Sequence, residues 1–168
     1  MITRRHLLAA SALLPLAARG TPPELVRPRG RVVLTISGRI GVRNAADAAQ
    51  FDMDMLAAMR QHSFSTHTPW YPQAHKFTGP LLREVLDAVG AHGRTLRAIA
   101  LNDYTVELPV EDATRYPVVL ARLFDDRPMS VREKGPLFII YPFDSDEALR
   151  SERYYSRSAW QLKAIDVV

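Results

Sequence analysis

Three histidines within fourteen positions are the first residues whose chemistry suggests a function. His62, His67 and His75 could ligate a metal ion, because a neutral imidazole is a common ligand of transition metals. On a strand, however, His62 and His67 would point to opposite faces, and no Asp, Glu or Cys lies between His62 and His75 to complete a ligand set. We therefore expect no metal site, and surface or hydrogen-bonded histidines instead.

Two neighbouring aromatic residues follow within the same stretch. Trp70 and Tyr71 stand between Pro69 and Pro72, and the two prolines favour a loop. The rings either cover the hydrophobic core or form the wall of a ligand site. The sequence leaves both interpretations open.

The densest group of basic and aromatic residues lies at positions 150–160. The guanidinium of Arg157 can hold a phosphate or carboxylate with two hydrogen bonds, and Trp160 offers a stacking surface beside Ser158. This composition predicts a site for a small anionic ligand or for the acidic patch of a protein partner. Because acidic residues such as Glu152 are interleaved, a solvated face held by ion pairs is the alternative.

The elements that position these residues follow from the hydrophobic pattern. β-branched, alternating or wholly apolar runs predict strands at 31–38, 62–68, 96–101, 104–108, 118–124, 136–143 and 160–167. Between two of these runs, Asn102 and Asp103 tolerate the left-handed conformation that a tight hairpin requires.

Helices are fewer and shorter. A helix beginning at Pro80 and ending before Gly90 would bury the stripe Leu82, Val85, Leu86 and Val89. A second, capped by Asn44 or Asp47, would carry Phe51, Met55, Leu56 and Met59. Further helical turns are expected at 109–113 and 144–153. Because strands outnumber helices, the predicted fold class is α+β, with a mixed β-sheet and a few short helices.

The composition is that of an ordinary globular domain. The chain has 168 residues, 47% of them hydrophobic and 24% charged, and no cysteine, which excludes disulfides and thiolate metal ligands. Three of its 22 basic residues lie in the first twenty positions, and without them 19 basic residues face 18 acidic ones. A near-neutral domain lacks the basic surface of a nucleic-acid binder, so we expect no nucleic-acid partner.

The first twenty residues resemble an export signal. The pair Arg4-Arg5 precedes an apolar run from Leu7 to Ala18, which is typical of a twin-arginine signal, although ordinary secretory signals carry such pairs too. The run is too short to cross a bilayer, so we expect no membrane-spanning protein. We predict a periplasmic or otherwise exported protein, with an export signal at 1–20, a flexible leader at 21–30 and a single domain at 31–168.

Several segments together resemble the sulfite oxidase-like molybdopterin-binding family over about residues 33–167. The similarity lies in the order and spacing of 77–86 (FTGPLLREVL), 99–104 (IALNDY), the turn from Leu120 to Met129, 135–137 (GPL) and 160–162 (WQL). The resemblance implies a sulfite oxidase-like fold. It also implies a pterin dithiolene, held by backbone and basic side chains, whose molybdenum takes one cysteine thiolate from the segment before the Phe-Thr-Gly-Pro run.

In this chain the segment that matches the family's metal-binding stretch is 63–68, which contains no sulfur. Thr66 fits the family's spacing best, and strand alternation places Ser65 and His67 on the opposite face. An oxygen donor replaces a thiolate poorly at a redox metal.

The resulting hypothesis is an exported domain without molybdenum redox chemistry and with no cofactor expected. It would bind a small anionic ligand, or an exported or membrane protein partner, through Thr66, His67, Trp70, Tyr71, Arg157, Ser158 and Trp160. The alternative is a molybdopterin-dependent oxidoreductase that holds its metal without a protein thiolate.

Overall fold

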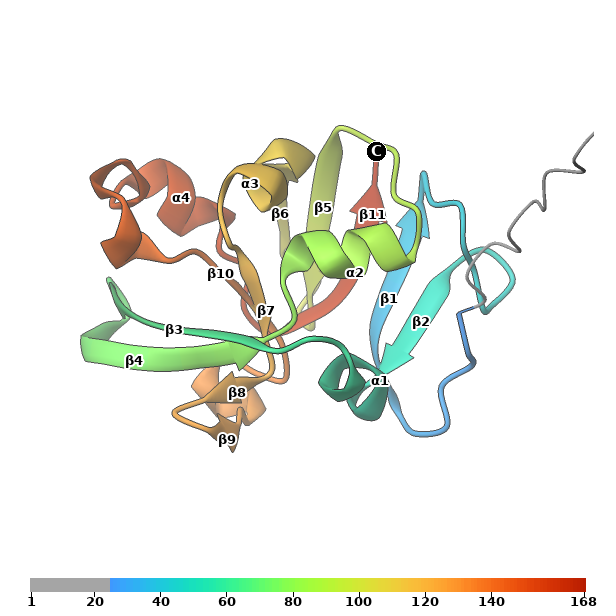
Figure 1. Cartoon of the computed structure of the whole chain (residues 1–168), viewed down its shortest axis with the longest axis horizontal. Coiled ribbons are helices and arrows are strands. Elements are labelled where there is room, and N and C mark those ends of the chain that lie inside the picture. Colours follow the sequence, from blue (N-terminus) through green and yellow to red (C-terminus); the bar gives the residue numbers. More distant parts are fainter. Residues whose placement is uncertain (1–24) are drawn as a thin grey trace, which may run out of the picture.

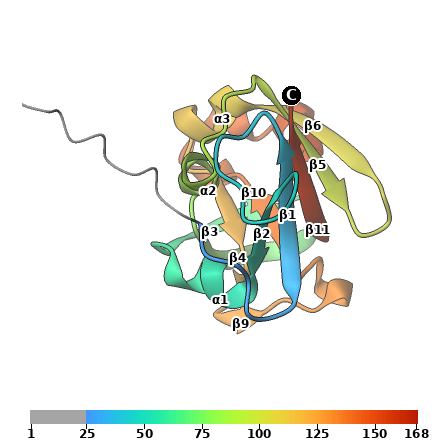
Figure 2. The same cartoon turned by 90° about the vertical axis from the view of Figure 1, so that its right-hand side faces the viewer.

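The computed structural model describes residues 25–168, and its largest layer is a twisted five-stranded sheet (Figure 1). In spatial order the strands are β2 (Ala49–Asp52), β1 (Val32–Gly38), β11 (Leu162–Val167), β5 (Thr95–Ala100) and β6 (Thr105–Pro109). β1 and β11 are parallel, and the other neighbours are antiparallel. The predicted α+β class with a mixed sheet is therefore confirmed. Figure 2 shows the β5–β6 hairpin at one edge of this sheet.

A second, four-stranded sheet contains residues 62–75, the stretch with the three histidines and the two neighbouring aromatic residues. Its strands are β3 (His62–Thr68), β4 (Tyr71–Gly79), β8 (Leu123–Phe124) and β9 (Arg127–Pro128), all antiparallel. A two-stranded ladder of β7 (Val119–Ala121) and β10 (Phe138–Ile140) contributes to the core beside it. Gly79 brings β4 close to β7, since a Cβ at this position would overlap the Leu120 carbonyl oxygen.

The helices are short. They are α1 (Met53–Ala58), α2 (Leu82–Ala88), α3 (Val110–Arg115) and α4 (Glu152–Arg157), with single 3₁₀ turns η1 (Val131–Glu133), η2 (Phe143–Ser145) and η3 (Glu147–Leu149). Within residues 25–168, no helix has the length and apolar character needed to cross a bilayer.

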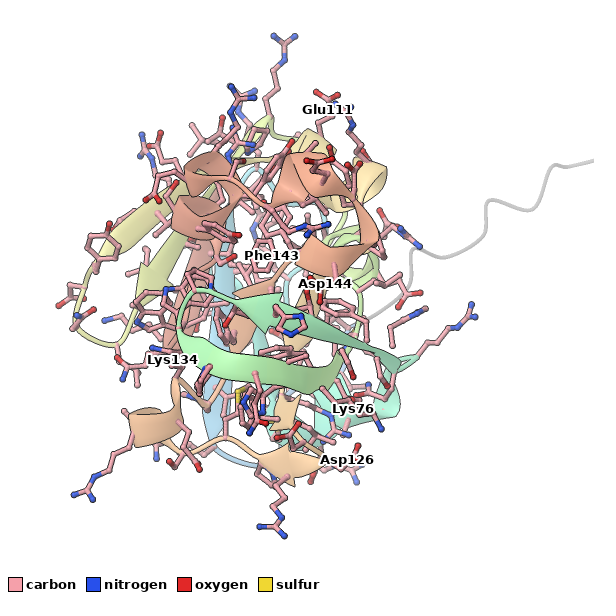
Figure 3. The ribbon with its side chains drawn as sticks, turned by 90° about the vertical axis from the view of Figure 1, so that its left-hand side faces the viewer. Lys76, Glu111, Asp126, Lys134, Phe143 and Asp144 are labelled. Carbon is pink, nitrogen blue, oxygen red and sulfur yellow. The ribbon has the colours of Figure 1, made fainter. Side chains whose placement is uncertain are left out.

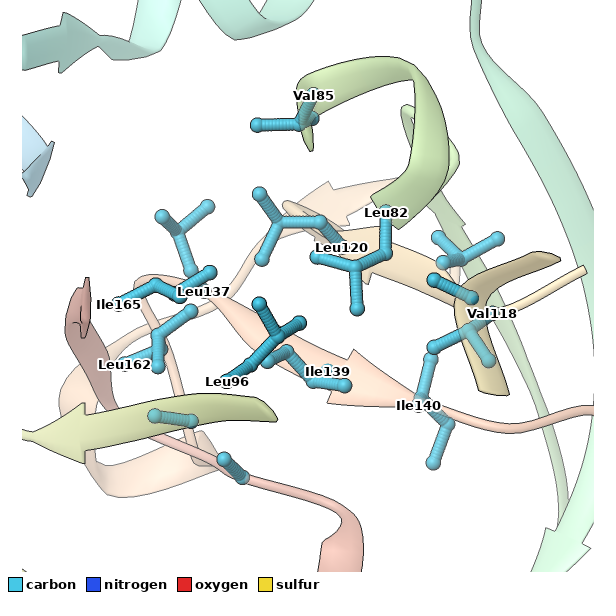
Figure 4. Close-up of a cluster of buried hydrophobic side chains, with 14 of the residues drawn as sticks. Leu82, Val85, Leu96, Val118, Leu120, Leu137, Ile139, Ile140, Leu162 and Ile165 are labelled. Carbon is cyan, nitrogen blue, oxygen red and sulfur yellow. The ribbon is translucent and has the colours of Figure 1, made fainter. Parts of the chain in front are cut away.

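The core lies between α2, the inner face of the five-stranded sheet and the β7–β10 ladder (Figure 4). Leu82 and Val85 of α2 are fully buried there with Leu96 of β5 and Ile165 of β11. The predicted buried stripe is confirmed, and Gly90 follows it with a φ of +59°, but the helix begins at Leu82, after the N-cap Leu81, and not at Pro80 as predicted.

Leu86 supplies a test of this packing. It is 4% exposed, so Leu86→Ala should lower the free energy of unfolding by about 2 to 5 kcal/mol. Asp87 is exposed on the same helix, and Asp87→Ala should change stability by about 0.5 kcal/mol or less. Urea unfolding followed by circular dichroism measures both variants. Equal losses would mean that α2 faces the core differently.

Several elements differ from the sequence prediction. The strand predicted at 118–124 is divided between β7 and β8, which lie in different sheets, and the helix predicted at 144–153 consists of the 3₁₀ turns η2 and η3, with α4 beginning only at Glu152. Phe51 lies in β2, and Asp52 caps α1 by accepting a hydrogen bond from the Met55 N–H at 2.9 Å, so the caps predicted at Asn44 or Asp47 are wrong. Trp70 forms a tight turn, and the chain pairs again from Tyr71 onward as β4. The apolar run 136–143 contributes a strand of only three residues, paired with β7 outside the large sheet.

The predicted export signal at 1–20 lies outside the described residues. The leader predicted at 21–30 is described from Leu25 onward, where it lies along β2. The Asn44 amide donates to the Val26 carbonyl at 2.7 Å, and Asp52 accepts from the backbone N–H groups of Arg29 and Gly30 at 2.8 Å each. Polar side chains thus hold the backbone of this segment against the sheet.

Candidate functional site

A groove of about 630 Å³ opens between the β5–β6 hairpin, α4 and the turn before β4. It collects residues from three stretches of the chain, 69–70, 98–106 and 152–160. They are Pro69 and Trp70, then Ala98, Ala100, Asn102, Tyr104 and Val106 of the hairpin, then Glu152, Tyr155 and Ser156 of α4, and finally Ser158, Ala159 and Trp160. We call this the aromatic groove, because four of these side chains are rings.

Trp70 stands at the centre of the ring contacts. Its ring centroid lies 5.2 Å from that of Trp160 and 6.2 Å from that of Tyr155, in edge-to-face arrangements. Below the groove it rests on Phe138 at 5.7 Å and Phe143 at 6.2 Å. Since contacts of this kind orient rings against one another, Trp70 both covers the core and forms a wall of the groove. Both interpretations of the Pro69–Pro72 stretch therefore apply to Trp70.

Tyr71 points elsewhere. Its ring packs against His75 and Phe124, each with a centroid distance of 5.0 Å. The phenol oxygen is buried and has no hydrogen-bond partner among the described residues. Burial raises the pKa of Tyr71, and the nearby charge of Glu133 raises it further. Tyr71 thus belongs to the four-stranded sheet and does not line the aromatic groove.

Lys134 links these two aromatic regions. Its ammonium lies 4.4 Å from the ring centroid of Trp160 and 5.9 Å from that of Tyr71, which are cation–π distances. Figure 3 shows Lys134 beside the turn between β3 and β4. Lys134 is not one of the residues that line the groove, so it approaches Trp160 from outside.

Arg157 turns away from the groove and into a buried polar network. Its Nη1 donates to Asp112 Oδ2 at 2.9 Å, and the Tyr141 hydroxyl donates to the same oxygen at 2.8 Å. Asp112 and Tyr141 are buried, and the Arg157 guanidinium also lies over the ring of Tyr154 at 5.4 Å. The positive charge of Arg157 is therefore neutralised by the Asp112 carboxylate inside the protein.

Thr66 does not fit the position of a metal ligand. It is fully buried, its hydroxyl accepts a hydrogen bond from the Asp144 N–H at 3.0 Å, and it donates to the His67 carbonyl at 3.3 Å. An oxygen engaged in this way joins two chain segments and is not directed at a cavity. Ser65 and His67 are exposed, so the alternation predicted for this strand is confirmed.

Each of the three histidines of the β3–β4 hairpin contacts a carboxylate from another element. The distances are 3.3 Å from His62 to Glu84 of α2, 2.9 Å from His67 to Asp144 of η2 and 2.7 Å from His75 to Asp125 of the β8–β9 turn. Figure 3 shows Asp144 next to β3. No group of three or more metal-binding side chains gathers anywhere in residues 25–168.

These contacts predict how the protein responds to acid. Hydrogen bonds from the His67 backbone N–H and then its ring lower the pKa of Asp144, and those from the Lys76 N–H and then His75 lower that of Asp125. A carboxyl whose pKa is depressed by folding stabilises the fold above its unfolded pKa of about 3.9, and this contribution is lost as the pH falls through the folded value.

We therefore expect the free energy of unfolding to drop below about pH 4. Asp144→Asn keeps an acceptor oxygen but removes the titrating carboxyl group. The free energy of unfolding of this variant should therefore fall less at low pH than that of the wild type. The matching change at exposed Asp47, Asp47→Asn, should leave the acid limb unaltered. Urea titrations between pH 7 and pH 2 give the free energy of unfolding of the three proteins as a function of pH. If this free energy falls equally steeply with acid in Asp144→Asn and in the wild type, Asp144 does not cause the acid loss of stability.

The structure brings together three of the seven residues predicted for the site, Trp70, Ser158 and Trp160. Thr66, His67, Tyr71 and Arg157 lie outside the groove. The sequence missed Tyr104 and Asn102, although an aromatic residue at a hairpin turn is a detectable signal, and Tyr104 is 67% exposed. The role of Asp112 could not be predicted from the sequence, because its partners lie 29 and 45 positions away.

No protein-family model matches the chain, and no curated protein matches it.

Proposed function

We propose that this chain is an exported binding domain with a sulfite oxidase-like fold, which takes a small ligand or a segment of a protein partner in the aromatic groove and performs no molybdenum redox chemistry. The observation that carries the proposal is the meeting of Trp70 and Trp160. These rings are far apart in the sequence, yet their centroids lie 5.2 Å apart on the wall of one groove. A concave site with aromatic walls and a few polar groups is typical of small-molecule recognition.

Polar groups at the rim support a ligand-binding role. Asn102 and Tyr104 from the hairpin face the groove opposite Glu152 and Ser156 from α4. All four are exposed, and two of them already make local hydrogen bonds, since the Ser156 hydroxyl donates to the Arg153 carbonyl at 3.0 Å and Asn102 Oδ1 accepts from the Tyr104 N–H at 3.2 Å. The Ser158 hydroxyl, in contrast, is buried and donates to the Tyr154 carbonyl at 3.1 Å. Ser158 thus shapes the groove, and the rim supplies specificity.

The charge of the groove bears on the predicted anionic ligand. Arg157, on which that prediction rested, is paired with Asp112. Among the described residues that line the groove, Glu152 is the only one with a charged side chain. Lys134 lies behind Trp160 and is the cation nearest to its ring. The groove therefore suits an anion only if Lys134 attracts it.

The proposed lack of redox chemistry rests on Thr66. The family resemblance places a metal-binding thiolate there, and the Thr66 hydroxyl is instead occupied by the Asp144 N–H and the His67 carbonyl. Molybdenum analysis of the protein purified from its native compartment tests this part of the proposal. Stoichiometric metal would overturn it and restore the oxidoreductase alternative.

Binding is tested through the two tryptophans. The chain has only two, and both line the groove, so its tryptophan emission reports on this site alone. A panel of anionic, neutral and cationic small molecules should include compounds that change the emission saturably. Tyr104→Ala removes an exposed ring from the groove and should weaken that binding. Val131→Ala, an exposed apolar change outside the groove, should not. A panel without any saturable response would reject the groove as a small-molecule site.

Export has its own test. Changing Arg4 and Arg5 together to lysine should leave precursor in the cytoplasm if the twin-arginine route is used. Undiminished export of this variant would indicate the ordinary secretory route.

A further inference from the structure

We propose that the aromatic groove binds a small organic cation with a quaternary ammonium group. This inference rests on the proposed binding function and assigns a ligand class to the same site. Four rings line the groove, those of Trp70, Tyr104, Tyr155 and Trp160. Aromatic side chains grouped around one cavity attract cations through the negative face of each ring, and tryptophan does so most strongly. Quaternary ammonium groups are the ligands that such aromatic cages recognise.

The protein already uses one of these rings in this way. The Lys134 ammonium lies 4.4 Å from the ring centroid of Trp160, well inside the distance of about 6 Å at which a cation and a ring attract each other. Lys134 comes from outside the groove, whereas a ligand would meet Trp160 from within it. Trp160 is thus positioned as a cation-binding ring, and the groove adds three further rings to it.

The charge balance of the groove agrees with a cation. Glu152, in the first turn of α4, places a carboxylate on the groove wall, and no described arginine or lysine side chain lines it. Arg157, only five positions further on, is held by Asp112 at 2.9 Å. A quaternary ammonium would meet aromatic rings and one lining carboxylate, with the Lys134 ammonium 4.4 Å from the Trp160 ring as the opposing charge nearby. It would not give up the hydrogen bonds that a primary ammonium makes with water.

The apolar part of the wall sets the preference for methyl groups. Ala98, Ala100 and Ala159 are buried and small, and Val106 is half-buried. Small side chains leave room between the rings, so a methylated nitrogen can make van der Waals contact with them. A bare ammonium would lose its hydration at such a surface, which is costly for a compact charge.

Choline and its neutral isostere 3,3-dimethylbutan-1-ol test the proposal. The two molecules have the same shape and differ in the central nitrogen, which is a carbon in the alcohol. Titration of the full chain, followed by tryptophan emission, should show saturable binding of choline. The neutral isostere should bind about tenfold more weakly, as expected for a cation–π contribution near the middle of its usual range.

Three variants separate the charge of the groove from its shape. Glu152→Gln should weaken choline binding about two- to fivefold, since it removes the only negative charge among the described residues that line the groove, and ion pairs with an exposed carboxylate contribute up to about 1 kcal/mol. Glu147→Gln, an exposed carboxylate outside the groove, is the matched control and should leave the affinity unchanged. Lys134→Gln removes a cation behind Trp160, so it should preserve or strengthen choline binding, whereas an anionic ligand would bind more weakly.

Several results would overturn the cation assignment. They are equal affinities for choline and the neutral alcohol, an unchanged affinity in Glu152→Gln, or no saturable response to choline. If choline fails while an anionic or neutral compound of the panel changes the emission, the groove still binds ligands and only the cation is wrong. If no compound of any charge binds, the proposed small-molecule site falls as well.

Discussion

Replacing Asp112 with alanine should lower the free energy of unfolding by about 3 to 5 kcal/mol. The Asp112 carboxylate is 8% exposed and accepts hydrogen bonds from Arg157 and Tyr141 through the same oxygen. Without it, a guanidinium that is only 23% exposed and a fully buried phenol would lose their partner. Breaking a buried pair by removing one member is costly, because the remaining charge stays desolvated.

The Tyr141 hydroxyl reports on the same network. Burial, and next the hydrogen bond to Asp112, raise the pKa of Tyr141 far above its usual range, so the phenol remains a donor at all physiological pH values. Asp112→Asn keeps an acceptor oxygen and should lose less stability than Asp112→Ala. Glu111→Ala, at the neighbouring exposed position, is the control and should be nearly neutral. Equal urea midpoints for Asp112→Ala and Glu111→Ala would show that the network does not stabilise the fold.

Local signals predicted several elements well. The β5–β6 hairpin follows from two strand-like runs with Asn102 and Asp103 between them, and Asp103 indeed takes a left-handed φ of 66°. The α2 stripe follows from helical spacing and from Gly90 beyond it. In each case the residues that determine the conformation lie within a few positions of one another. A short stretch of sequence is therefore sufficient to predict the element.

Other features depend on residues far apart in the chain. Pro72 favoured a loop, yet it lies in β4. This strand has β3 on one side along its length, but it pairs with β8 on the other side only at Phe77 and Thr78. The N–H that Pro72 lacks is therefore not needed by a second neighbouring strand. Phe51 fitted a helical pattern, yet it pairs with Leu34 of β1 as part of β2. Here tertiary pairing decided between two conformations that the local sequence allowed.

In the groove, too, some features follow from the local sequence and others depend on residues far apart in the chain. Trp70, Ser158 and Trp160 could be selected as candidates because aromatic and polar residues in loops are typical of binding sites. That Arg157 would be drawn to Asp112 could not be predicted, because the choice depends on how α3 and α4 meet. The sequence therefore indicated several residues of the groove but not its charge, and the proposed ligand class depends on that charge.

Phe138 connects the core to the groove, and Phe138→Ala should lower the free energy of unfolding by about 3 to 5 kcal/mol. Its fully buried ring lies 5.8 Å from Phe77, 5.7 Å from Trp70 and 6.1 Å from Trp160, measured between centroids. Because both tryptophans rest on it, the variant should also shift their emission to longer wavelength and weaken binding in the groove.

A conservative variant separates positioning from general stability. Phe138→Leu retains most of the buried volume and should cost about 1 kcal/mol, with tryptophan emission close to that of the wild type. Binding by the wild type and the two variants is then compared without urea, at a temperature at which circular dichroism shows all three proteins to be folded. If Phe138→Ala loses stability but keeps wild-type emission and affinity, Phe138 only fills the core. If emission and affinity change together while the protein stays folded, the ring positions Trp70 and Trp160, and the groove is an extension of the core's aromatic packing to the surface.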